Sequence, residues 1–183
     1  MATKLRRLLD AFGRFVGLPW QEGLSGDEKV WFCMYEPRDE RRLSVRLPEF
    51  EMAAIRAGHS WVLLDVTHSF EEWMASHEYR EAYFAQPELL SPAIDDFFEK
   101  LSGRLRHSLE SSDDNTVVAL VGSGSLFGIT RVSSIVAEIA DSIAGRLLVF
   151  FPGTREGSNY RLLDARDGWN YRAVPIEATE KGE

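Results

Sequence analysis

The chain has 183 residues, of which 44% are hydrophobic and 27% are charged, and its formal net charge is −8. This length predicts a single folded domain, and the composition excludes a disordered chain. The acidic balance argues against a protein that binds nucleic acid over its whole surface, because such proteins are usually basic. No apolar run approaches the roughly 20 residues of a membrane-spanning helix. Asp10 and Arg14 also interrupt any signal-peptide core, so we expect a cytoplasmic protein.

The N-terminal segment, residues 1–17, has the pattern of an amphipathic helix. Its apolar residues form one helical stripe, which consists of Leu5, Leu8, Leu9, Phe12, Phe15 and Val16. The polar side is basic, with Lys4, Arg6, Arg7 and Arg14 against the single acid Asp10. We favour a helix that packs on its own domain. Two alternatives are docking on a partner through Arg6, Arg7 and Phe12, or binding at a membrane surface.

The middle of the chain alternates between strand and helix patterns. Residues 29–35 predict a buried strand, within which Cys33 is expected to be an unreactive core thiol. Residues 43–47 alternate apolar and polar, which predicts a half-exposed strand. Pro48 then suits the first turn of a short helix over residues 49–57. Residues 60–66 predict a strand, and residues 69–109 predict two or three acidic helices broken at Pro87 and Pro92.

The last third predicts a β-α-β unit of a parallel sheet. Its parts are a strand at 116–121, a glycine-rich turn at 122–128, a helix at 131–143 and a strand at 147–151. Residues 161–163 and 171–176 predict short edge strands, and 177–183 a polar tail. The fold we expect is a single α/β domain over residues 1–176, a three-layer open sheet, mostly parallel, with helices on both faces. Its inner strands are 30–35, 61–65, 117–121 and 147–151.

The glycine-rich turn is a candidate anion-binding site, because backbone N–H groups at a helix N-terminus can hold a phosphate. The residues that would form it are Gly122, Gly124, Ser125 and Arg131. No lysine followed by serine or threonine comes after the glycines, so the turn is not a P-loop. We favour tight packing between strand and helix as its role, and we expect no cofactor.

No catalytic or metal site is expected elsewhere. The chain has four histidines, His59, His68, His77 and His107. Asp65, His68 and His77 fall near one strand end, but their spacing matches no zinc or catalytic pattern. Neither Ser123 nor Ser125 sits in a nucleophile-elbow sequence.

Residues 150–171 form an extended polar segment rich in arginine, asparagine and aromatic residues, the types that dominate protein–protein binding energy. Its candidate partner residues are Arg155, Asn159, Tyr160, Arg161, Trp169 and Tyr171. The favoured alternative is an edge structure held together by its own arginine–aspartate pairs. A small-ligand site is a further alternative.

Five stretches of the chain resemble the BrxB family. They are Ala57-Gly58-His59-Ser60-Trp61, Glu72-Trp73-Met74-Ala75 with His77-Glu78-Tyr79-Arg80, Val117-Val118-Ala119-Leu120-Val121-Gly122, Gly124-Ser125-Leu126-Phe127-Gly128 with Arg131-Val132-Ser133, and Leu147-Leu148-Val149-Phe150-Phe151-Pro152-Gly153 through Tyr160-Arg161-Leu162-Leu163-Asp164. The resemblance extends from about Leu5 to Ile176. It supplies no catalytic residues.

The resemblance implies a place in a BREX phage-exclusion system, beside a DNA methyltransferase, a large ATPase, a Lon-like protease and the alkaline-phosphatase-superfamily protein PglZ. It therefore implies a non-enzymatic adaptor whose first candidate partner is PglZ, with the methyltransferase and the ATPase as further candidates. A homodimer is an additional alternative. The competing functions are a nucleotide- or anion-binding regulator, and a nucleic-acid-binding subunit. The arginines of residues 155–172 alternate with acids, so we do not expect direct nucleic-acid binding.

Overall fold

The computed structural model describes residues 3–156, 159–162, 165–167 and 173–178. Its centre is a five-stranded sheet in the order β2-β3-β4-β1-β8, in which every pair of neighbours is parallel. The strands are β1 (Val30–Tyr35), β2 (Ser60–Asp65), β3 (Thr116–Val121), β4 (Arg146–Pro152) and β8 (Val174–Ile176). The expected α/β class with a parallel sheet is confirmed.

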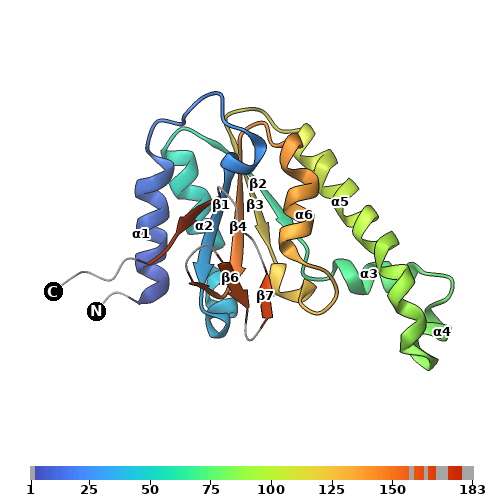
Figure 1. The fold of residues 1–183 in the computed structure, drawn as a ribbon. Coiled ribbons are helices and arrows are strands. Elements are labelled where there is room, and N and C mark those ends of the chain that lie inside the picture. Colours follow the sequence, from blue (N-terminus) through green and yellow to red (C-terminus); the bar gives the residue numbers. More distant parts are fainter. Residues whose placement is uncertain (1–2, 157–158, 163–164, 168–172, 179–183) are drawn as a thin grey trace.

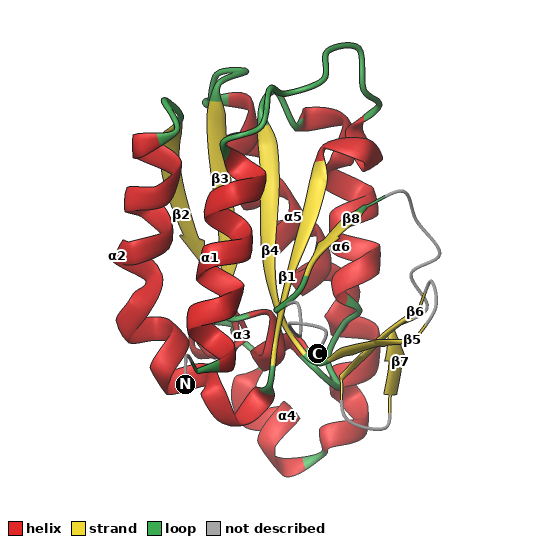
Figure 2. Ribbon diagram, turned by 90° about the vertical axis from the view of Figure 1, so that its left-hand side faces the viewer, coloured by secondary structure: helices red, strands yellow, loops and turns green. Residues whose placement is uncertain are grey.

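Helices cover both faces of this sheet, which gives three layers (Figures 1 and 2). One face is covered by α1 (Lys4–Val16) and α2 (Glu40–Arg56). The other is covered by α3 (Ser69–Ser76), α5 (Ile94–Glu110) and α6 (Val132–Ile139). The short α4 (Arg80–Ala85) lies with α3 at the carboxyl ends of the strands. Short 3-10 helices span Gly26–Lys29, Pro37–Asp39, Pro87–Ala93, Ser123–Leu126 and Ala140–Ser142.

Side-chain alternation along the strands divides the core into two clusters. In β1, Phe32 faces α5 and α6, whereas Cys33 faces α1 and α2. The same alternation in β4 sends Val149 to the first cluster and Phe150 to the second. Every residue of β1, β3 and β4 is buried, as expected for strands covered on both faces.

The expectation that residues 61–65 form an inner strand is wrong. β2 is the edge of the sheet and pairs only with β3, from Ser60 opposite Thr116 to Asp65 opposite Val121. Leu63 remains 46% exposed. The apolar run predicted a strand correctly, but such a run does not show whether a neighbouring strand lies on each side or whether both faces are fully covered. The three other inner strands are confirmed.

The expected strand at residues 43–47 is also wrong, because these residues lie in α2, a single helix of 17 residues. Leu43, Phe50 and Ala54 form its buried face, at helical spacing. Val45 is 80% exposed on the opposite side. Pro48 lies inside the helix and not in its first turn.

The C-terminal third adds a second, smaller sheet. Its strands β5 (Thr154–Glu156), β6 (Asn159–Leu162) and β7 (Ala165–Asp167) are antiparallel and follow the carboxyl end of β4. Figure 2 shows this sheet beside the lower end of the main one. β8 then returns to the main sheet as its second edge, where Pro175 is tolerated, as expected.

Candidate functional site

Helix α1 begins at the N-cap Thr3, whose hydroxyl oxygen accepts a hydrogen bond from the backbone N–H of Arg6. The expected apolar stripe faces the sheet of its own domain. Phe12 is fully buried, with its ring centroid 5.5 Å from that of Phe50 and 6.3 Å from that of Trp61. Phe12 is therefore a core residue, which corrects its expected place on a partner surface.

The basic side of α1 is partly engaged by the chain itself. The exposed Arg6 pairs with Asp10 at 3.3 Å and with Glu49 of α2 at 3.5 Å. Arg7 is half-buried, and its Nε atom has no hydrogen-bond partner among the described residues. Of the three expected contact residues, only the two arginines are near the surface.

The second expected partner surface maps to the small sheet. Arg155 lies exposed on β5 and its backbone pairs with that of Tyr160 on β6. Asn159 and Arg161 are also β6 residues, and Thr154 is the register partner of Arg161. Trp169 and Tyr171 lie outside the described residues.

The glycine-rich turn is filled by its own neighbours. Gly122 has a left-handed backbone, with φ of +80°, and a Cβ at this position would lie 2.5 Å from the backbone nitrogen of Thr67. A Cβ at Gly124 would lie 3.0 Å from Pro152. The turn thus needs glycine at these two positions, because the chain at the carboxyl ends of β2 and β4 lies directly against its backbone.

The hydroxyls of this turn are bonded to the backbone. Ser123 is buried and donates to the carbonyl of Phe150 at 2.8 Å. Ser125 lies 2.8 Å from the carbonyl oxygen of Gly122 and 3.2 Å from that of Val66. Arg131 is exposed at the N-terminus of α6. This geometry supports the packing role of the turn.

The histidines are dispersed, and within the described residues no three potential ligands cluster as a metal site would require. His68 is paired with Glu71 on the surface, and that hydrogen bond raises its pKa. His77 contacts the rings of Trp73 and Tyr83. His59 lies at the opposite end of the sheet, in a cleft that the sequence did not indicate.

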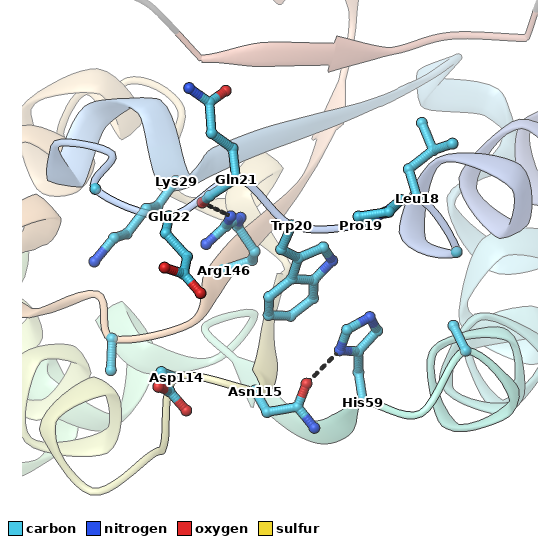
Figure 3. Close-up of a pocket in the computed structure, with 14 residues that line it drawn as sticks. Leu18, Pro19, Trp20, Gln21, Glu22, Lys29, His59, Asp114, Asn115 and Arg146 are labelled. Carbon is cyan, nitrogen blue, oxygen red and sulfur yellow. Dashed lines mark hydrogen bonds between the residues drawn. The ribbon is translucent and has the colours of Figure 1, made fainter.

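This cleft, of about 630 Å³, opens at the amino ends of the strands, below the segment that follows α1 (Figure 3). Trp20 lies between His59, stacked at 3.8 Å between ring centroids, and the Arg146 guanidinium, 4.7 Å from the ring centroid. Both broad faces of the indole are therefore covered. His59 also contacts the side chain of Asn115, whose amide donates to the carbonyl of Gly58.

Arg146 is the buried charge of the cleft. It is 5% exposed and donates hydrogen bonds to the carbonyls of Gly145 and Gln21, each at 2.9 Å. It forms no ion pair with any described residue, and burial lowers its pKa. Lys29 is likewise bonded to the carbonyl of Ile143. Trp20 contacts both His59 and Arg146, and Arg146 donates to the backbone of Gln21. These three residues form a clamp that holds residues 17–23 against the amino ends of the strands.

This arrangement has no signature in the sequence, because its residues come from separate segments. Trp20 follows α1, His59 precedes β2 and Arg146 begins β4. No motif joins them, although the amino ends of parallel strands always meet at one edge of a sheet.

Comparison with known proteins identifies the family. A family model described as BREX protein BrxB matches residues 53–176, more than half of the chain. The chain belongs to the BrxB family. The BrxB match extends from the end of α2 to β8 and includes the glycine-rich turn. Membership in BrxB places the chain in a BREX phage-defence system. No curated protein and no solved structure matched it.

The BrxB match begins after α1 and β1, so the two basic residues Arg6 and Arg7 lie outside it. Among the described residues, no helix has the length and apolarity needed to cross a membrane.

Proposed function

We propose that this chain is a non-enzymatic assembly subunit of a BREX system, that it acts in the cytoplasm, and that its direct partner is the PglZ-type component. The observation that carries this proposal is the BrxB family match over residues 53–176. The site geometry supports it, because Ser123 and Ser125 of the glycine-rich turn and Arg146 of the cleft bond to the chain's own backbone.

The binding arm of the test is co-purification. The tagged chain is expressed with each BREX neighbour separately, and the PglZ-type component should co-elute in a stoichiometric complex that persists through size exclusion. Other BREX components, such as the methyltransferase and the ATPase, are further candidates and are tested in parallel. Failure of every neighbour to bind at micromolar concentration would contradict the assembly role.

The activity arm separates an adaptor from an enzyme or a nucleotide-binding regulator. The isolated chain should bind ATP, GTP and NAD no better than millimolar in calorimetry, because the turn lacks the lysine that reaches the phosphates of a P-loop. A low-micromolar nucleotide site that Gly124→Val abolishes would replace the assembly proposal with the regulatory one.

A further inference from the structure

Helix α2 has two apolar faces, and only one of them is buried. Leu43, Phe50 and Ala54 face the sheet. On the opposite side a second apolar stripe has steps of three, four and three residues, which place its members on one line along a helix. This outer stripe consists of Val45, Pro48, Met52 and Ile55. Val45 is 80% exposed, and Met52 and Ile55 are about half exposed. Apolar side chains aligned along one exposed face mark an interaction surface.

The outer stripe borders a groove between α1 and α2, which lie side by side on the same face of the sheet (Figure 2). The groove has a volume of about 700 Å³. Its apolar lining consists of Leu9 and Gly13 of α1 and of Pro48, Met52 and Ala53 of α2. A Cβ at Gly13 would lie 3.9 Å from that of Ala53, so small residues bring the two helices together under the groove.

Two arginines at the rim of the groove have no ion-pair partner in the part of the chain that the structure describes. Arg6 is neutralised by Asp10 and Glu49, but Arg14 and Arg56 form no ion pair with any described residue. Both arginines are exposed at the same end of the groove, on a chain whose net charge is −8. An apolar lining with cations at its rim is complementary to an apolar face flanked by carboxylates.

We propose that the groove between α1 and α2 binds an amphipathic helix of another protein, with acidic residues beside its apolar face. This inference rests on the proposed assembly function and names the surface that serves it. Met52, which belongs both to the outer stripe and to the lining of the groove, is the apolar anchor. Arg14 and Arg56 pair with the acids of the incoming helix.

Other occupants fit the groove less well. A nucleic acid would leave the apolar lining at Pro48 and Met52 without contacts, since phosphates bind only the rim. A second copy of the chain would bring the free arginines of both copies together. Binding to a membrane surface would need the apolar side of α1 to be exposed. That side packs in the core, where Leu8 and Phe12 are buried.

The test uses the full chain and the BREX subunit that it captures. Met52→Glu places a charge in the apolar lining of the groove and should weaken binding by at least about tenfold, because it leaves a carboxylate against an apolar surface. The matched control is Leu89→Glu, a residue of similar exposure on the opposite side of the sheet, which should bind like wild type. Circular dichroism should show both variants folded.

Charge reversal at the rim of the groove is a second, independent test of the same surface. Arg14→Glu combined with Arg56→Glu should also weaken binding by about tenfold, with the deficit shrinking at high salt. Arg106→Glu on α5 reverses a charge on the other face and should not affect binding.

The outcomes separate the two proposals. No binding by the wild-type chain to any BREX subunit overturns both. Wild-type binding that survives Met52→Glu and the double reversal overturns the groove and leaves the assembly role intact. Binding of the wild-type chain to duplex DNA or to phosphatidylserine vesicles, lost in the same variants, would reassign the groove to that ligand.

Discussion

Gly122 shows how one residue closes the fold at the carboxyl end of the sheet. Its left-handed backbone turns the chain out of β3, and its missing Cβ admits the backbone of Thr67. Gly128 has nearly the same φ, +79°, but a Cβ there would meet nothing within 4 Å. The two glycines therefore differ in packing and share the same backbone requirement.

Alanine at these two positions should separate the two effects. Gly128→Ala should lower the free energy of unfolding by about 1 kcal/mol, the cost of a left-handed alanine. Gly122→Ala should cost about 3 kcal/mol or more, because the methyl group also displaces Thr67. Urea denaturation of both variants measures the difference, and equal losses would contradict the close approach.

Cys33 offers a second test at the residue scale. It is fully buried in β1, and burial raises the pKa of its thiol, so the reactive thiolate is scarce. At about pH 8, a thiol reagent should not modify the native chain, and urea should expose one reactive thiol. A Ser44→Cys variant, which places a second thiol on the exposed side of α2, is the positive control. Complete labelling of Cys33 within seconds in native buffer would show that the β1–α2 packing is wrong.

Among the elements, α2 shows what the sequence could and could not predict. The sequence patterns correctly predicted α1, α5, β1, β3 and β4, because the apolar residues of these elements pack in the core. In α2 the alternation of Leu43, Val45 and Leu47 suggested a strand, because Val45 is an apolar residue that faces outward. An apolar residue on the exposed side of the helix thus disturbed the helical periodicity.

The candidate sites were predicted less well than the fold, for a related reason. Phe12 was correctly placed in an apolar stripe, but a stripe does not reveal whether it faces its own sheet or a partner. The clamp of Trp20, His59 and Arg146 depends on three segments meeting, which no local pattern encodes.

Pro48 gives a prediction for the helix as a whole. A proline inside α2 removes the N–H that would donate to the carbonyl of Ser44. Pro48→Ala should therefore stabilise the chain by about 1–3 kcal/mol, since alanine restores the donor and is the best helix former. Thermal unfolding measures this as a raised Tm. A lowered Tm would mean that the proline ring itself contributes packing that the exposed position does not indicate.

Over the whole molecule, charge and apolar surface are distributed unevenly. The chain is acidic, yet α1 and α2 present arginines beside exposed apolar side chains on one face of the sheet. The opposite face is covered by α5 and α6, where Arg106 is paired with Glu138. A protein with this asymmetry should approach an acidic partner in a preferred orientation, and added salt should slow that association.

The assembly role is the central claim, and sedimentation velocity of the purified chain with the purified PglZ-type component tests it most directly. A single faster-sedimenting complex should form at micromolar concentration without nucleotide or DNA, and Met52→Glu, but not Leu89→Glu, should weaken it by at least about tenfold. Two independent boundaries at the rates of the separate proteins would contradict the assembly role.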